Sequence, residues 1–209
     1  MILSIPDMHE LAARCAPSVA AETLLAVAKV ESGFNPLAIG VNGRPAVQVR
    51  ASDKADAVAK AATLIAQGRN VDLGLAQINS RNLAWLGLTV EAAFDPCRNL
   101  AASARVLQDG YGRGASKGAG EQPALLAALS YYNTGHPERG IRNGYVAKVT
   151  KAAATIVPAL RPAQLANLAE APAAEAEVEH PAWDVFGRAR PPATFVIQIS
   201  SAQSAGGQE

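Results

Sequence analysis

The spacing of apolar residues early in the chain predicts an amphipathic helix over residues 18–32. Leu24 and Glu31 are seven positions apart with apolar residues between them at helical spacing, so Glu31 lies on the face that packs inward. Gly33 and Pro36 follow at once, and both residue types end helices. The pattern therefore places a carboxylate on an apolar surface, in the last turn of a helix.

The rest of the globular part is predicted to be mainly α, with one small β-hairpin. Asn42-Gly43 separates two short apolar runs, which is a strong signal for a hairpin over residues 37–41 and 46–50. Five glycines between Gly110 and Gly120 predict a flexible loop. Further helices are expected over residues 52–68 and 79–87, from Asp95-Pro96 onward, from Pro123 onward, and over 142–157.

The composition of the chain changes after Pro158. Residues 159–182 are rich in Ala, Pro and Glu and lack the large apolar residues of a core, so we expect a disordered linker. In the tail over 183–209, Trp183 and Phe186 stand in polar surroundings. They are consistent with a short docking motif, although chance occurrence explains them equally well. Residues 1–158 are therefore expected to form the folded domain.

Overall composition excludes several classes of function. The chain has 209 residues, 49% of them hydrophobic, and a net charge of +1, which gives nucleic-acid binding no electrostatic support. No apolar run approaches the length of a membrane span. His9, His136 and His180 are scattered without ligand spacing, so we predict no metal site and no cofactor. Residues 1–5 lack the features of an ordinary secretory signal.

The chain contains two cysteines, Cys15 and Cys97. They could form a disulfide if the mature protein lies outside the cytoplasm. They could equally be two small buried apolar residues. The sequence leaves both interpretations open.

The predicted position of Glu31 favours acid–base chemistry. The negative end of the helix dipole and burial against an apolar face both raise the pKa of a carboxyl group. A general acid near neutral pH needs such a raised pKa. The common alternative is a solvated glutamate at a helix end, and other segments of the chain make it less attractive.

Three polar segments accompany Glu31. Residues 72–79 present the amides of Gln77 and Asn79, and amides suit sugar hydroxyls and N-acetyl groups because they both donate and accept hydrogen bonds. Residues 129–135 end a predicted buried helix with two tyrosines and Asn133, and Tyr145 begins the last helix. Each segment alone has an ordinary structural explanation as a loop, a cap or a core residue.

Taken in order, these segments resemble the lytic transglycosylase domain related to goose-type lysozyme. The resemblance covers roughly residues 15–155, with Ala76 in place of a methionine and Tyr131 in place of an alanine. The residues around Cys15, Cys97 and 34–41, and the tail at 183–186, are more specifically similar to the transglycosylase component of bacterial type IV secretion systems. The matching residues are Glu31-Ser32, Gly74-Leu75-Ala76-Gln77-Ile78-Asn79, Tyr131-Tyr132-Asn133-Thr134-Gly135 and Tyr145.

The resemblance implies a lysozyme-like α+β fold, a helical bundle around a cleft. It also implies that Glu31 cleaves the bond between N-acetylmuramic acid and N-acetylglucosamine, first as acid and then as base, with formation of a 1,6-anhydro ring. It further implies action in the periplasm and contact of Trp183 and Phe186 with the secretion apparatus. By the same resemblance, Tyr132 and Tyr145 would orient Glu31, and Ser32, Gln77, Asn79 and Asn133 would hold the sugar.

Two alternatives remain at this stage. A goose-type lysozyme hydrolase would share the fold, and Asp72 would have to serve as the base that activates water. A non-catalytic assembly protein would use the domain only to bind glycan. Glu31 argues against the second alternative, because a binding module has no need of a carboxylate on an apolar face.

Overall fold

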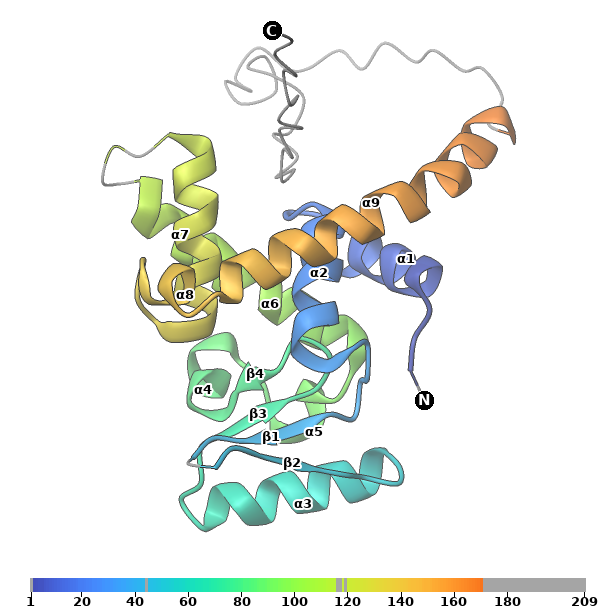
Figure 1. Cartoon of the computed structure of the whole chain (residues 1–209). Helices are drawn as coiled ribbons and strands as arrows, with labels where there is room; N and C mark the ends of the chain where they lie inside the picture. Colours follow the sequence, from blue (N-terminus) through green and yellow to red (C-terminus); the bar gives the residue numbers. More distant parts are fainter. Residues whose placement is uncertain (1, 44, 116–117, 119, 171–209) are drawn as a thin grey trace, which may run out of the picture.

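The computed structural model describes residues 2–43, 45–115, 118 and 120–170. Helices make up one part of the molecule, and the long helix α9 crosses it beside α2 in Figure 1. The helices of this part are α1 (Ile5–Cys15), α2 (Ala21–Ser32), α6 (Pro96–Ala115), α7 (Glu121–Thr134), α8 (Arg139–Arg142) and α9 (Tyr145–Glu170).

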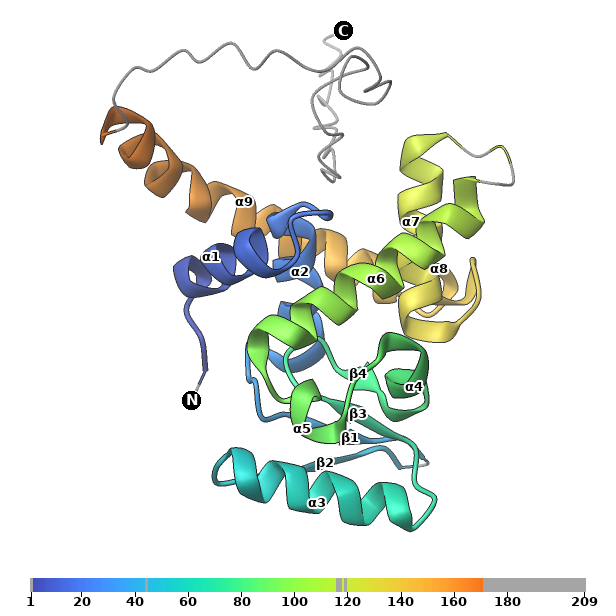
Figure 2. The ribbon, with the colours of Figure 1, turned by 180° about the vertical axis from the view of Figure 1, so that it is seen from behind.

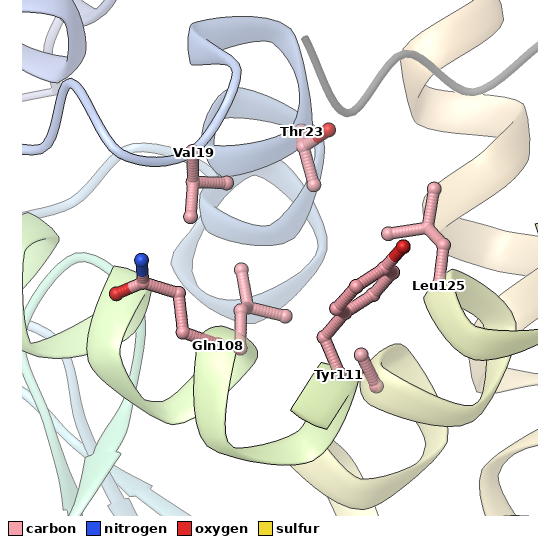
Figure 3. Close-up of a pocket in the computed structure, with 7 residues that line it drawn as sticks. Val19, Thr23, Gln108, Tyr111 and Leu125 are labelled. Carbon is pink, nitrogen blue, oxygen red and sulfur yellow. The ribbon is translucent and has the colours of Figure 1, made fainter. Parts of the chain in front are cut away.

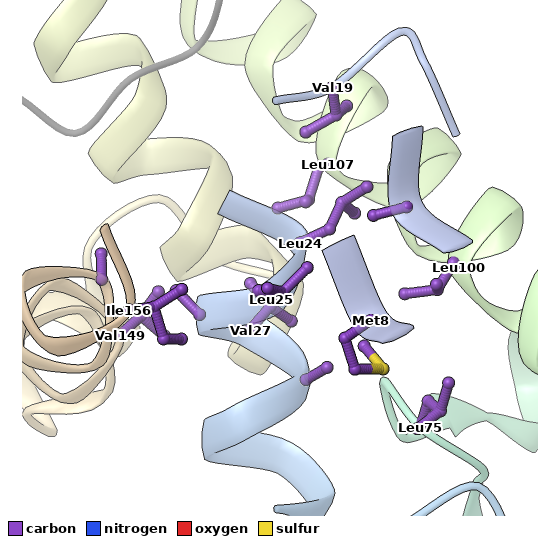
Figure 4. Packing of buried hydrophobic residues seen from close by; sticks show 14 of the residues in the cluster. Met8, Val19, Leu24, Leu25, Val27, Leu75, Leu100, Leu107, Val149 and Ile156 are labelled. Atoms are coloured by element: carbon purple, nitrogen blue, oxygen red, sulfur yellow. The ribbon is translucent and has the colours of Figure 1, made fainter. Parts of the chain in front are cut away.

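Helix α2 is the centre of the helical core. Figure 4 shows Leu24, Leu25 and Val27 of α2 between apolar side chains of neighbouring helices, among them Val149 on α9 and Leu107 on α6. All three α2 side chains are fully buried. The helix is held by this packing, since its N-cap Ala20 supplies no side-chain hydrogen bond.

The second part is a four-stranded antiparallel sheet in the order β2-β1-β3-β4, with short helices around it. Figures 1 and 2 show α3 along this sheet, at the end of the molecule opposite α9. Its elements are β1 (Ile39–Val41), β2 (Val47–Val49), α3 (Lys54–Ala66), β3 (Val71–Leu73), β4 (Ile78–Asn79), the 3₁₀ turn η1 (Ser80–Asn82), α4 (Leu83–Leu86) and α5 (Val90–Ala93).

The predicted mainly α fold with a small sheet is confirmed, and the sheet is larger than expected. The predicted hairpin forms as β1 and β2, with Ile39 opposite Val49. The segment 72–79, for which the sequence predicts no strand, adds β3 and β4, and β3 pairs with β1 through Ile39 and Leu73. Strands of two or three residues are too short to show a period in the sequence, which explains the error.

The glycine-rich segment also differs from the prediction. Helix α6 continues through Gly110 and Gly114 to Ala115, where we expected a flexible loop. A Cβ on Gly110 would lie 3.2 Å from the backbone of Ala128, and one on Gly114 would lie 3.2 Å from that of Ala124. These glycines therefore allow α6 and α7 to pack closely, which offsets their poor helix propensity.

The last helix extends beyond the expected end of the folded domain. Helix α9 passes through the exposed Pro158 and continues to Glu170, and Leu160 is buried in the helical core. The boundary predicted at residue 158 therefore falls inside a helix, and the first part of the predicted linker is helical. Trp183 and Phe186 lie outside the described residues.

Helix α1 was not expected from the sequence. Ser4 and Asp7 form a reciprocal capping box at its start, and Met8 and Ala12 bury its inner face. A disulfide joins Cys15, at its end, to Cys97 in the first turn of α6, with the two Cα atoms 5.3 Å apart. The disulfide therefore ties the two helices to each other on one side of α2.

Candidate active site

Glu31 lies where the helical part meets the sheet. It occupies the last turn of α2, which ends at Gly33 in the left-handed conformation, with φ of +62°. The Tyr145 hydroxyl, from the first residue of α9, donates a hydrogen bond of 2.6 Å to Glu31 Oε1. Asn143 Oδ1 accepts from the Tyr145 backbone N–H at 3.0 Å and fixes the start of that helix. The first residue of α9 thus holds one oxygen of a carboxyl group that α2 carries, although the two residues are far apart in the sequence.

The surroundings of Glu31 suit proton transfer near neutral pH. The pKa of Glu31 is raised from 4.5 to about 7, chiefly by burial; the hydrogen bond from Tyr145 lowers it, and the nearby Asp72 carboxylate adds a smaller upward shift. Burial also raises the pKa of the Tyr145 hydroxyl, which therefore stays protonated and able to donate. At pH 7 the Glu31 carboxyl is consequently present in both protonation states.

A polar cleft of about 520 Å³ opens beside Glu31. Across the cleft from Glu31 are side chains of the sheet part, including Asp72 and Asn79, and Asn133 lies at the end of α7. A second hollow shares Glu31 and is lined by Ser32 and by Gln48 of β2. Glu31 therefore lines both hollows.

The turn between β3 and β4 is fixed by buried polar contacts. Gly74 has φ of +74°, and Gln77 adopts φ of +49°, an unusual backbone conformation for a residue with a side chain. The fully buried Asn99 accepts from Ala76 N at 2.8 Å and donates to Leu73 O at 2.9 Å. Sequence analysis did not identify Asn99, which lies inside a helix with no local signal of its role.

Gln77 and Ser32 both face the site, but their hydrogen-bond donors are used within the protein. Gln77 Nε2 donates to Gly74 O at 2.9 Å and to Ala38 O at 3.1 Å. The Ser32 hydroxyl donates to Leu75 O at 2.6 Å and so ties α2 to the turn. Sugar binding by either side chain would have to use its acceptor oxygen.

The Tyr132 hydroxyl, which the resemblance assigns to Glu31, makes its hydrogen bonds elsewhere. It donates to Ala76 O at 2.7 Å and lies 3.1 Å from Ser103 Oγ. The side chain packs against both apolar clusters, and burial raises the pKa of its hydroxyl. Tyr132 therefore supports the turn beneath the cleft, and Tyr145 alone of the two makes the predicted contact with Glu31.

A network of amides surrounds Asp72 on β3. Asn79 Nδ2 donates to its Oδ1 at 2.6 Å, and Asn42 Nδ2 donates to its Oδ2 at 2.7 Å. Burial raises the pKa of Asp72, and these two hydrogen bonds lower it. Asn70 also lines the cleft, and its buried Oδ1 has no hydrogen-bond partner. That acceptor could receive an N–H or O–H of a bound ligand. Sequence analysis identified neither Asn42 nor Asn70 as a site residue.

Asn133 lies at the rim of the cleft. Its Oδ1 accepts from Asn143 Nδ2 at 2.9 Å, and its side chain is exposed. Asn143 also accepts a hydrogen bond from the backbone of Tyr145, and Tyr145 binds Glu31. Asn133 is therefore linked to Tyr145 through Asn143.

Other features do not compete as active sites. Figure 3 shows an apolar pocket between α2, α6 and α7, lined by Val19 and Leu125, with no carboxylate among its lining residues. Within the described part of the chain, no cluster of three or more His, Cys, Asp or Glu side chains could hold a metal. None of the described helices is long and apolar enough to span a membrane.

Comparison with known proteins agrees with this geometry. Residues 9–153 match the family model described as the transglycosylase SLT domain. The chain is 44% identical to protein virB1 of Rhizobium radiobacter over 158 residues, which are 76% of this chain and 65% of that protein. It is 40% identical to protein virB1 of Agrobacterium fabrum over 185 residues, 88% of this chain and 72% of that protein.

A third relative carries a more informative name. The chain is 44% identical to the type IV secretion system protein virB1 of Brucella abortus over 149 residues, 68% of this chain and 62% of that protein. The chain thus spans just under two thirds of the length of the relatives from Rhizobium and Brucella. No solved structure matches it significantly.

Proposed function

Because the chain belongs to the transglycosylase SLT domain family, we propose that it is a peptidoglycan lytic transglycosylase in which Glu31 is both acid and base. The observation that carries the proposal is the state of the Glu31 carboxyl. Its pKa is raised to about 7, Tyr145 holds one oxygen, and a long polar cleft passes beside it.

The proposed reaction needs only one carboxyl group. Protonated Glu31 donates its proton to the glycosidic oxygen between N-acetylmuramic acid and N-acetylglucosamine, and the C1–O bond breaks. The N-acetyl carbonyl of the substrate stabilises the positive charge at C1. The Glu31 carboxylate then takes the proton from the C6 hydroxyl, and O6 bonds to C1 to close the 1,6-anhydro ring. Glu31 ends protonated, as it began, and no water is consumed.

The role of Tyr145 follows from its contact. By holding Oε1 at 2.6 Å, the hydroxyl restricts the rotamer of Glu31 and leaves Oε2 for proton transfer. The same hydrogen bond stabilises the carboxylate formed after the first step, since it lowers the pKa of Glu31. Tyr145 is therefore a positioning residue that acts through Glu31.

Hydrolysis of the same bond is the second candidate, because Asp72 lines the cleft together with Glu31. A hydrolase would use Asp72 to activate water. Its two carboxylate oxygens already accept hydrogen bonds from Asn79 and Asn42, so Asp72 is better placed to hold these amides than to accept a proton from water.

Mass spectrometry of purified peptidoglycan digested by the full chain separates these reactions. A transglycosylase releases 1,6-anhydromuropeptides, whereas a hydrolase releases reducing ends.

We expect Glu31→Gln to reduce the rate by at least about 10²–10⁴, the range for loss of a general acid. Asp72→Asn is the matched control, a carboxyl-to-amide change in the same cleft. It should keep the anhydro product and most of the rate, and its inactivity would favour hydrolysis.

The relative from Brucella is named as a type IV secretion system protein. We propose by analogy that this chain acts in the periplasm and opens the cell wall locally for such a system.

The tail, with Trp183 and Phe186, would contact the apparatus. Truncation after Glu170, the end of α9, should leave cleavage of isolated glycan intact and abolish recruitment. Loss of glycan cleavage would show that the tail belongs to the active domain.

A further inference from the structure

A hollow with aromatic walls adjoins the cleft. It is lined by Trp85 of α4, by Asp109 and Arg113 of α6, and by Tyr131 of α7. Tyr131 lines the cleft as well, as do three other residues of this hollow, and Glu31 is not part of the hollow. The groove beside Glu31 therefore continues past the catalytic carboxyl and along the short helix α4, which lies beside β4 in Figures 1 and 2.

Trp85 is exposed and at the same time held in place. Its relative exposure is 46%, which is high for the largest apolar side chain. The Arg105 guanidinium lies 5.6 Å from the centre of the indole ring and donates to Leu86 O at 2.8 Å, at the end of α4. A rigid, exposed aromatic ring at the edge of a polar groove is the usual form of a ligand-contacting surface.

The lining of the hollow also includes a second aromatic ring and a pair of charges. The Arg113 guanidinium lies 5.9 Å from the centre of the Tyr131 ring, and Arg113 Nε is 2.9 Å from Asp109 Oδ2. Gly110 leaves room for Tyr131, since a Cβ there would lie 3.1 Å from the Tyr131 Cβ. The hollow thus offers apolar ring faces together with hydrogen-bond donors and acceptors.

These features match the surface of a sugar ring, which has an apolar face of C–H groups and a polar rim. We propose that Trp85 and Tyr131 form an additional sugar-binding subsite for a residue of the glycan strand distant from the bond that is cleaved. The inference rests on the proposed function for the class of ligand. Asp109 and Arg113 would bind the hydroxyl or acetamido groups at the rim of that sugar.

Intrinsic fluorescence tests the contact directly, because the chain contains two tryptophans, Trp85 and Trp183. In the full chain with Glu31→Gln, to prevent turnover, and Trp183→Phe, emission comes from Trp85. Titration with chitohexaose, an oligomer of N-acetylglucosamine, should change the Trp85 emission with the same Kd that calorimetry gives. Binding without a change in emission, or no binding, would overturn the subsite.

Affinity gives an independent readout. In the Glu31→Gln chain, Trp85→Ala should weaken chitohexaose binding about tenfold, equivalent to about 1.4 kcal/mol, and Trp85→Phe should restore most of it. Ile141→Ala is the matched control, since Ile141 is also an exposed large apolar residue but lines a separate hollow on α8 and α9. Equal affinities of the Trp85→Ala and Ile141→Ala chains would overturn the proposal.

Failure of this subsite is distinguishable from failure of the proposed function. If wild-type chain releases anhydromuropeptides while Trp85 emission does not respond to chitohexaose, only the subsite is wrong. If Trp85 responds but no glycan is cleaved, the subsite stands and the transglycosylase activity is wrong.

Discussion

The two parts of the molecule that meet at the cleft contribute different chemistry. The helical part surrounds α2 with large apolar side chains and brings Glu31 and Tyr145 to its edge. The sheet part has its own apolar core, but it turns a row of amide and carboxyl groups toward the cleft, among them Asn42, Asp72 and Asn79. The helical part therefore sets the protonation of one group, and the sheet part supplies hydrogen bonds for a polar ligand.

The difference shows how burial and polarity are combined in one site. A carboxyl group needs apolar surroundings for its pKa to rise, while a sugar needs polar partners. Placing Glu31 at the boundary gives it both. Tyr132, which packs against both apolar clusters, joins the two parts directly beneath the cleft.

The largest expected effect comes from the disulfide in the helical part. Replacing Cys15 and Cys97 together by alanine opens a loop with a sequence separation of 82 residues. The entropic model then gives a loss of about 4–5 kcal/mol in the free energy of unfolding, measured by urea denaturation. A loss below about 1 kcal/mol would contradict this. Hydrogen exchange of the same variant adds a local readout: protection lost only in α1 and α6 would show that the two parts open independently.

A smaller effect of opposite sign is expected at Glu31. Its folded-state pKa is about 7 against 4.5 unfolded, so the fold favours the protonated form and loses stability as the pH rises from 4.5 through 7. Glutamine at position 31 cannot ionise. The free energy of unfolding of the Glu31→Gln variant should therefore exceed that of wild type by about 3 kcal/mol at pH 8 and be similar to it at pH 4.

Urea denaturation at both pH values measures this difference. Glu22→Gln, at the start of the same helix and outside the cleft, controls for the loss of one formal charge. A stability gain for Glu31→Gln that is the same at pH 4 and pH 8 would exclude a buried, protonated Glu31.

The two tyrosines provide a smaller and more selective test. Tyr145→Phe removes the hydrogen bond that lowers the pKa of Glu31, so the alkaline limb of the pH–rate profile should move to higher pH, with kcat reduced about tenfold. Tyr132→Phe removes the same atom but only loosens the turn at Ala76. It should raise KM with little shift of the limb. Equal shifts in the two variants would contradict the separate roles.

The sequence predicted the helical part better than the sheet part. The helix that ends at Glu31 and the starts of α3 and α6 follow from apolar spacing and capping residues such as Asp53 and Pro96. The strands β3 and β4 have only three and two residues, and their pairing depends on the distant β1. The extension of α6 through Gly110 depends on its close packing with α7.

The candidate site, too, could be predicted from the sequence only in part. Glu31 and its contact with Tyr145 could be proposed from the sequence, because a resemblance in ordered motifs supplied both residues. The partners of Tyr132 could not, since Ala76 and Ser103 come from other segments that fold beneath it. Asn70, whose buried Oδ1 has no hydrogen-bond partner, gave no signal, because its importance lies in burial beside the cleft.

Apolar burial at the edge of the helical part is expected to keep Glu31 partly protonated at neutral pH. NMR titration of the full chain, with ¹³C-labelled glutamate side chains and Glu31→Gln to assign the signal, measures this pKa directly. We predict a midpoint at about 7 for the Glu31 carboxyl. A midpoint near the ordinary value of 4.5 would show that burial does not keep Glu31 protonated at neutral pH.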